Sequence, residues 1–221
     1  MLKKKSTVII LAVVVCCAVM AVVDGIISPH YAVKSAVKAV LFLGIPAVIC
    51  RNSGLKELFK TEKNGLGRAL LLGMAVYSII VGGYFLLKEV FDFSAITEAL
   101  TGNIGVNREN FAFVAIYISF VNSFLEEFFF RGFGFLTLKK FLSPRVASVF
   151  SAAIFSLYHI AMMGGWFSAG LYILCIVGLF VGGLIFNKLN VKFGNIYTSW
   201  LVHMFANFAI NTIGFILFGI I

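Results

Sequence analysis

Seven stretches of this sequence are long enough and apolar enough to cross a lipid bilayer as helices. The hydrocarbon core of a bilayer is about 30 Å thick and takes roughly 20 apolar residues in a helix. The stretches are 7–23, 32–50, 68–87, 110–130, 145–163, 166–186 and 195–221. The last is long for one crossing and could be broken near 207–211, which leaves an eighth short element open. We therefore predict an all-α, polytopic membrane bundle of seven to eight transmembrane helices.

The composition excludes a soluble globular domain. Hydrophobic residues make up 61% of the 221 residues and charged residues only 12%, whereas soluble domains average about a quarter charged residues. The formal net charge of +9 would suggest nucleic acid as the partner of a soluble protein. Here the chain has no basic patch interleaved with exposed aromatic residues, and its basic residues gather between the apolar stretches. We therefore expect the lipid bilayer, and no nucleic acid, as a partner.

The basic residues also indicate how the bundle is oriented. Cytoplasmic loops of membrane proteins carry an excess of lysine and arginine. With the N-terminus inside, most of the 18 basic residues fall on the cytoplasmic side, while Lys34, Lys38, Lys88 and Arg108 fall toward the outside. The first apolar stretch is longer than the roughly 7–15 residues of a signal-peptide core, so we interpret it as an uncleaved helix. We predict an integral protein of a bacterial cell membrane with a cytoplasmic N-terminus.

Two further patterns concern packing. Leu55, Leu58 and Phe59 recur at helical spacing among lysines, which predicts a short amphipathic helix on the inner membrane surface. We predict that helices pack closely at five glycines of the second half, and two of them, Gly178 and Gly182, form a G-x-x-x-G pattern that is typical of such contacts. The five are Gly164, Gly165, Gly178, Gly182 and Gly183.

Ionisable side chains interrupt the apolar stretches in the second half of the chain. Such groups are costly within a membrane, usually face the bundle interior and mark functional sites. The ionisable residues are Glu126, Glu127, Arg131, His159 and His203, and their polar companions are Asn122 and Asn207. They fall in or next to the fourth, fifth and seventh stretches, so we predict that three helices contribute to one site.

Spacing assigns the acidic and basic members of this set to helix faces. Residues four apart lie on one face of a helix, so Glu127 and Arg131 can form an ion pair. Asn122 and Glu126 share another face, which is turned by about 100°. We therefore expect Arg131 to neutralise Glu127 and Glu126 to face a cavity.

A carboxylate, two imidazoles and a carboxamide in an apolar cavity are suited to hydrolysis of an amide bond. A carboxylate removed from water is a stronger base, which can accept a proton from water near neutral pH. His203 and Asn207 are also four residues apart, and both can donate hydrogen bonds to a developing oxyanion. Alternatively, Glu126, His159 and His203 could ligate Zn²⁺, which would then activate the water. The residue types alone do not separate these two mechanisms.

Three motifs in this order resemble those of the CPBP family, which comprises type II CAAX prenyl proteases and bacteriocin-processing or immunity proteins and is also called the Abi family. The motifs are EEFFFR at 126–131, FSLYH at 155–159 and HMFAN at 203–207. The resemblance covers about residues 110–221, whereas residues 1–109 share only their hydrophobicity with the family. We therefore divide the chain into N-terminal transmembrane helices and loops, 1–109, and a CPBP-like catalytic core, 110–221.

The resemblance implies a role for each residue of the motifs. Glu126 is similar to the water-activating glutamate of the family, and His159 is similar to its partner. His203 and Asn207 are similar to the oxyanion-hole pair. The supporting residues, which pair with each other and position the site, are Glu127 and Arg131.

The implied activity is that of an intramembrane endopeptidase that hydrolyses a peptide bond of a membrane-associated peptide or protein. Both a metal-dependent and a metal-free glutamate mechanism are argued for the family, so the cofactor is either Zn²⁺ or none. The physiological role would be CAAX-type processing, bacteriocin maturation or self-immunity. Two alternatives stay open: a non-catalytic immunity protein, and a proton-coupled transporter that uses Glu126 and the histidines as a relay.

The depths of the predicted site residues conflict. Glu126 and His203 lie near the inner ends of the fourth and seventh stretches, whereas His159 lies near the outer end of the fifth. The three side chains can meet only if the fifth helix starts later or tilts, or if the helices enter the membrane unevenly.

Overall fold

The computed structural model describes residues 2–51, 55–59 and 65–221. Within these ranges every regular element is helical, and seven helices are long and apolar enough to cross a membrane. They are Lys4–Ile27, Tyr31–Ile49, Leu66–Leu87, Phe111–Lys140, Pro144–Met162, Ala169–Phe193 and Tyr197–Leu217. Each predicted stretch lies largely within one of them. The prediction of an all-α, polytopic membrane bundle is confirmed.

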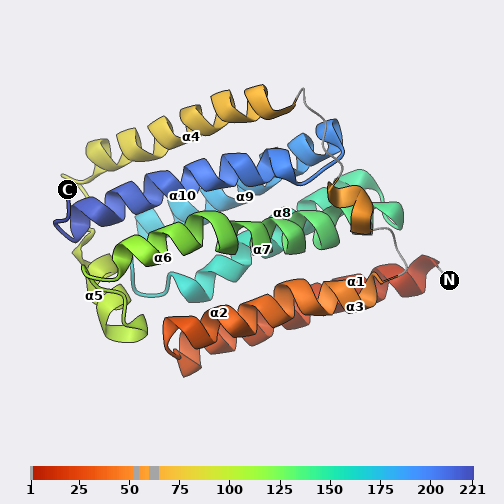
Figure 1. The fold of residues 1–221 in the computed structure, drawn as a ribbon, viewed down its shortest axis with the longest axis horizontal. Helices are drawn as coiled ribbons and strands as arrows, with labels where there is room; N and C mark the ends of the chain where they lie inside the picture. Colours follow the sequence, from red (N-terminus) through yellow and green to blue (C-terminus); the bar gives the residue numbers. More distant parts are fainter. Residues whose placement is uncertain (1, 52–54, 60–64) are drawn as a thin grey trace.

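The spanning helices run along the long axis of the molecule, and the two chain ends lie at opposite ends of the bundle (Figure 1). Elements of the first half are α1 (Leu2–Val22), α2 (Tyr31–Ala39), α3 (Ile45–Ile49), α4 (Leu66–Leu87) and α5 (Ser94–Ile104). Those that follow the fourth spanning helix are α8 (Pro144–Met162), α9 (Ala169–Phe193) and α10 (Tyr197–Leu217). Helix α4 packs on α10, α8 packs on α9, and α1 packs on α8.

The fourth spanning helix is the most buried of the seven and changes its winding along its length. It consists of α6 (Phe111–Tyr117), a π turn (Ile118–Asn122), α7 (Ser123–Glu126), a longer π segment (Glu127–Thr137) and a 3-10 turn (Leu138–Lys140). The expected end at residue 130 is therefore wrong. The apolar run stops at Arg131, but the helix continues because every residue of 131–138 is covered by neighbouring elements.

Aromatic rings fix the second spanning helix against the fourth. Phe42, in the π turn Val40–Gly44 between α2 and α3, stacks on Phe129 with ring centroids 4.0 Å apart. Its ring also meets Phe130 edge-on at 5.5 Å and contacts Tyr158 of α8 at 5.4 Å. Offset and edge-to-face aromatic pairs each add about 0.5–1.5 kcal/mol beyond the area they bury. This cluster therefore sets how α2 lies against the centre of the bundle.

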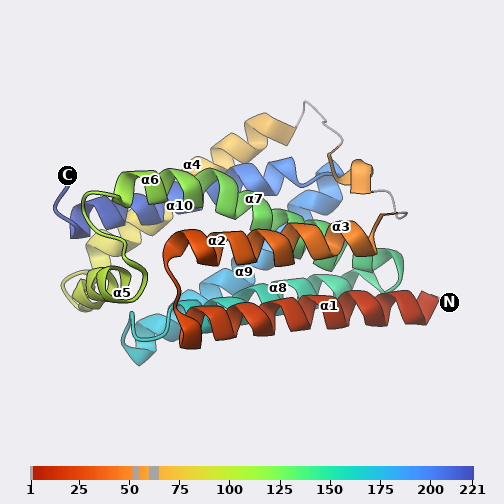
Figure 2. The ribbon, with the colours of Figure 1, turned by 60° about the horizontal axis from the view of Figure 1, so that its bottom comes forward.

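The helices enter the bundle at different depths, which resolves the conflict noted above. In both ribbon views α8 begins farther toward the N-terminal end of the bundle than α10 does (Figures 1 and 2). The extension of the fourth helix to Lys140 carries the chain to that level before α8 starts at Pro144. His159, in the last turn of α8, is therefore brought level with His203, in the first half of α10.

The last helix is not broken near 207–211, because α10 is continuous from Tyr197 to Leu217. The additional element of the bundle is instead α5, which lies at the end opposite the N-terminus and is too short, at 11 residues, to span a membrane (Figure 1).

The predicted amphipathic segment is only partly described, since residues 52–54 and 60–64 lie outside the described ranges. A 3-10 turn covers Leu55–Phe59. The Leu58 side chain is buried, and its carbonyl accepts a hydrogen bond of 3.2 Å from the amide of Ile196. The ring of Phe59 stacks with those of Phe124 and Phe128. In the described part, this segment therefore packs onto the bundle.

Of the three glycines of α9 that are predicted to pack closely, Gly183 does so, whereas Gly178 and Gly182 do not. A Cβ atom at Gly178 or Gly182 would meet nothing within 4 Å. At Gly183 it would lie 3.0 Å from both Cα and Cβ of Ala152 in α8. The prediction of close packing is therefore confirmed at Gly183, whereas Gly178 and Gly182 make no such contact with the described residues.

We expect Gly183→Val to lower the free energy of unfolding by about 1–3 kcal/mol, because the new side chain would overlap the backbone of α8. Gly182→Val is the matched control, since it places the same residue one position away where space is open. Thermal unfolding of both variants in detergent checks this expectation. Equal melting temperatures for the two variants would contradict it.

Candidate active site

Three helices bring a glutamate and two histidines together inside the bundle. Glu126 lies in α7, His159 in α8 and His203 in α10, and the three side chains are buried. Glu126 Oε2 lies 3.9 Å from His159 Nε2 and 3.7 Å from His203 Nε2. The structure therefore places these three residues, which the motifs predicted, around one point.

The partners of the histidines determine which ring nitrogens face this point. His159 Nδ1 lies 2.7 Å from the carbonyl oxygen of Phe155, which can only accept, so Nδ1 carries the proton. His203 Nδ1 lies 3.0 Å from Glu127 Oε1, a carboxylate oxygen that accepts in the same way. In the neutral ring the other nitrogen, Nε2, is then an acceptor. Three hydrogen-bond acceptors, Glu126 Oε2 and the two Nε2 atoms, therefore face one another. A water molecule placed among them can donate its hydrogens to these acceptors.

Lys38 of α2 is a member of the site that the sequence analysis missed. Its ammonium group donates hydrogen bonds of 2.5 Å to Glu126 Oε1 and to Asn122 Oδ1, and the side chain is buried. Asn122 Nδ2 also donates to Glu126 Oε1, at 3.1 Å. Glu126, which was expected to face a cavity while Arg131 neutralised Glu127, therefore has a buried cation of its own. The signal was present, because Lys38 falls within the second apolar stretch, where any ionisable residue is costly.

Glu127 and Arg131 form the ion pair that their spacing predicts. Arg131 Nε lies 3.6 Å from Glu127 Oε1, and both side chains are fully buried. The guanidinium carbon also lies 4.1 Å from the ring centre of Phe155 and 5.3 Å from that of Phe186, distances typical of cation–π contacts. Glu127 also accepts a hydrogen bond from His203 Nδ1. The Glu127–Arg131 pair therefore helps to fix the orientation of the His203 ring.

Asn207 is close in sequence to His203 but has a different partner. Its amide Nδ2 donates a hydrogen bond of 3.0 Å to the carbonyl oxygen of Ile118. Among the described contacts, its side chain bonds to the fourth spanning helix and not to Glu126 or His203. The predicted oxyanion role of Asn207 stays a prediction.

Side chains of α10 donate hydrogen bonds to the fourth spanning helix in and around the π turn that precedes the site. Asn211 donates to the carbonyl of Ala115 at 3.0 Å and to Ser119 Oγ at 2.9 Å. Trp200 Nε1 donates to Ser123 Oγ at 2.9 Å. Asn211 and Trp200, which the motifs did not single out, therefore help to hold the fourth helix in this shape.

The donor geometry does not fit a zinc ion. Two ligands of one tetrahedral zinc lie roughly 3.3 Å apart when each bond is about 2.0–2.1 Å long. Glu126 and the histidines are farther apart than this, at 3.7 and 3.9 Å, and the Lys38 ammonium already holds the other carboxylate oxygen. In the part of the chain that the structure describes, no group of three His, Cys, Asp or Glu side chains is placed to hold a metal ion. The zinc alternative for Glu126, His159 and His203 finds no support in this geometry.

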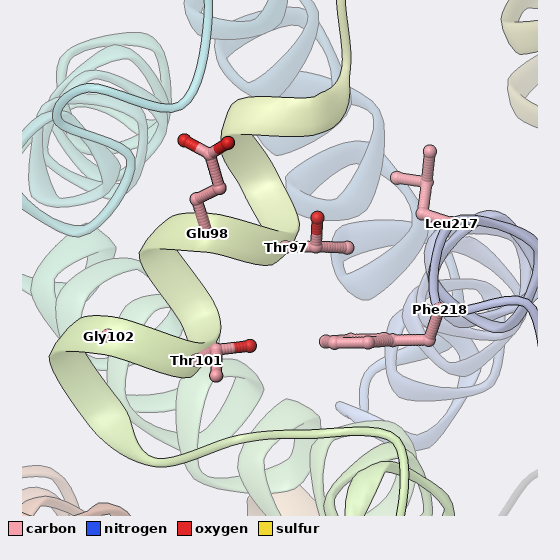
Figure 3. A pocket seen from close by; sticks show the side chains of 6 residues that line it. All are labelled: Thr97, Glu98, Thr101, Gly102, Leu217 and Phe218. Carbon is pink, nitrogen blue, oxygen red and sulfur yellow. The ribbon is translucent and has the colours of Figure 1, made fainter.

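A separate pocket of about 550 Å³ lies between α5 and the end of α10 (Figure 3). Its lining residues are Thr97, Glu98, Thr101, Gly102, Leu217 and Phe218. The side chains of Thr97, Thr101 and Phe218 point into the space between the two helices. None of the predicted site residues lines it, so it is distinct from the buried cluster.

A bundle of spanning helices around buried carboxylates and histidines defines an integral membrane protein with a polar site inside the membrane. Residues 108–209 match the model of a family described as Type II CAAX prenyl endopeptidase Rce1-like. The matched segment is a little under half of the chain, and the match confirms the predicted resemblance to this family of peptidases. All six site residues that the motifs predicted lie within it, whereas Lys38 lies outside it.

No curated protein and no solved structure matches this chain.

We expect Arg131→Met to lower the free energy of unfolding by about 3–5 kcal/mol, because it would leave Glu127 buried without its cation. Arg145→Met is the control, because Arg145 is exposed and its loss should cost no more than about 0.5 kcal/mol. Unfolding of both variants in detergent measures the difference. A loss for Arg131→Met no larger than that for Arg145→Met would show that the pair is not needed.

Proposed function

We propose that this protein is an intramembrane endopeptidase that hydrolyses a peptide bond of a membrane-associated peptide or protein with water activated by glutamate and histidine. The observation that carries this proposal is the approach of Glu126 to His159 and His203 within the buried part of the spanning helices. Buried ionisable groups that converge from separate helices are costly for a membrane protein, which favours a catalytic purpose over a structural one.

The proposed nucleophile is a water molecule between Glu126 Oε2 and His159 Nε2. These atoms are 3.9 Å apart, too far for a direct hydrogen bond. A water oxygen can lie at about 2.8 Å from each of them and donate one hydrogen to each acceptor. Its lone pairs then point away from both groups and toward a substrate carbonyl carbon.

In the proposed reaction, Glu126 accepts a proton from the water as the water oxygen bonds to the carbonyl carbon. The carbonyl oxygen becomes an oxyanion. Asn207 has one amide N–H beyond the one given to Ile118 and can donate it to this charge. His203 can donate from Nε2 in its imidazolium form, which takes up one proton from solvent before the reaction and keeps the Nδ1 hydrogen bond to Glu127. When the C–N bond breaks, Glu126 returns the proton to the leaving amine, which restores the carboxylate.

The proposed substrate class is supported by the family match and by the location of the site. The family description supports CAAX-type processing, in which the substrate is a lipid-anchored protein. Bacteriocin maturation or self-immunity is the alternative role if the protein comes from a bacterial cell membrane. The excess of basic residues at the N-terminal end of the bundle favours a cytoplasmic N-terminus.

We expect Glu126→Gln to lower kcat by about 10²–10⁴-fold, since it removes the general base without changing the size of the side chain. Glu89→Gln is the control, because that carboxylate is 81% exposed. The assay is cleavage of a prenylated CAAX-type peptide and of a bacteriocin-precursor peptide in proteoliposomes, with melting temperatures measured for both variants.

Retained cleavage in folded Glu126→Gln protein would exclude the proposed mechanism. Protection of cells that survives this substitution would instead favour a non-catalytic immunity protein. Ion-dependent solute uptake without cleavage would favour a transporter.

We expect cleavage to be unaffected by a chelator and the active, purified protein to hold much less than one zinc per chain. The reason is that the carboxylate and imidazole atoms are not placed to share a metal ion. Elemental analysis of the active sample, with cleavage assayed before and after chelation, checks this. Stoichiometric zinc whose removal abolishes cleavage would overturn the metal-free mechanism.

A further inference from the structure

The contacts of Lys38 form a built site for a single ammonium group. Two oxygen atoms, Glu126 Oε1 and Asn122 Oδ1, each accept a hydrogen bond of 2.5 Å from it. Two aromatic rings also face it, with Nζ at 5.3 Å from the ring centre of Phe42 and 5.1 Å from that of Tyr158. Ammonium groups within about 6 Å of an aromatic ring centre are attracted to the ring face. Side chains from three spanning helices therefore hold this one cation.

The place of Lys38 is set by packing that does not depend on its charge. Phe42, one helical turn further along the second spanning helix, stacks on Phe129 with ring centroids 4.0 Å apart. Phe129 is itself three residues from Glu126 in the fourth spanning helix. The stacked rings therefore hold Lys38 and Glu126 side by side.

Lys38 completes the charge balance of the buried cluster. Glu127 has Arg131 as its cation, at 3.6 Å. Without Lys38, Glu126 would be a second buried carboxylate with no cation, and removal of one partner from a buried pair is strongly destabilising. The ion pair thus accounts for how a carboxylate can lie within the membrane.

The two oxygens of Glu126 have different partners as a result. Oε1 receives both Lys38 Nζ and Asn122 Nδ2, at 2.5 and 3.1 Å. Oε2 is the oxygen that faces His159 and His203, at 3.9 and 3.7 Å. Because a carboxylate is planar, fixing Oε1 also fixes the direction of Oε2.

We propose that Lys38 is a positioning residue of the proposed hydrolytic site, which holds Glu126 by Oε1 so that Oε2 is presented to the water between this oxygen and His159. This inference rests on the proposed function. Lys38 acts through Glu126 and does not contact the substrate. It extends the site into the second spanning helix, outside the segment 108–209 that matches the family.

Lys38→Met tests this proposal, with Lys34→Met as the matched control. Lys34 lies one helical turn away on the same helix and pairs with the buried carboxylate of Asp24 at 2.7 Å. Both substitutions therefore remove a lysine from a buried ion pair, but only Lys38 reaches Glu126. We expect Lys38→Met to lower kcat by about 100-fold, the loss typical of a misplaced catalytic group, with little change in KM. Lys34→Met should keep the wild-type kcat.

Chemical rescue separates positioning from general stability. We expect ethylammonium to restore part of the kcat of Lys38→Ala, because the small cation can occupy the position of the missing ammonium group, and to leave Lys34→Ala unchanged. Wild-type kcat in Lys38→Met, or an equal loss in the two methionine variants, would overturn the proposal.

A stability measurement tests the ion pair without any substrate. Lys38→Met should lower the melting temperature, and addition of Glu126→Gln should recover most of that loss, because no unpaired carboxylate then remains. Additive losses in the double variant would overturn the ion pair itself. If the wild-type protein cleaves nothing while the recovery is observed, the proposed function fails and the Lys38–Glu126 contact stands.

Discussion

The ion pair between Lys38 and Glu126 joins the two halves of this protein at the centre of the bundle. A single carboxylate in a low-dielectric interior is costly, and the cost is offset only when a cation and further hydrogen bonds are supplied. Here one cation comes from the second spanning helix and the other, Arg131, from the fourth itself. The packing of α2 against the fourth helix is thus both a structural contact and a condition for placing Glu126 inside the membrane.

The fourth spanning helix shows a second consequence of placing polar groups in a bilayer. Its two π segments, Ile118–Asn122 and Glu127–Thr137, flank Glu126. π turns within helices are frequent at functional sites. Asn207 and Asn211 of α10 bond to the carbonyls of Ile118 and Ala115. The same helix that supplies His203 therefore also stabilises the backbone that carries Glu126.

Site residues come from different parts of the chain, and the matched family segment covers only some of them. Glu126, His159 and His203 lie within 108–209, whereas Lys38 belongs to the N-terminal helices. The N-terminal helices therefore contribute a charged group to the buried cluster in addition to apolar surface. In the proposed endopeptidase, the two histidines therefore face Oε2 of Glu126, and Lys38 of the second spanning helix binds Oε1.

The sequence by itself determined the class of fold, the number of spanning helices and the identity of the three residues that converge. It could do so because a run of about 20 apolar residues and the spacing of a motif are local properties. Only the tertiary structure decided which partner neutralises Glu126, since Lys38 is 88 residues away in sequence. It also decided that His203, 76 residues from Glu127, is held by that carboxylate. Such contacts depend on how far each helix enters the bundle and how it is rotated, and the π segments change both in ways that regular helical spacing does not predict.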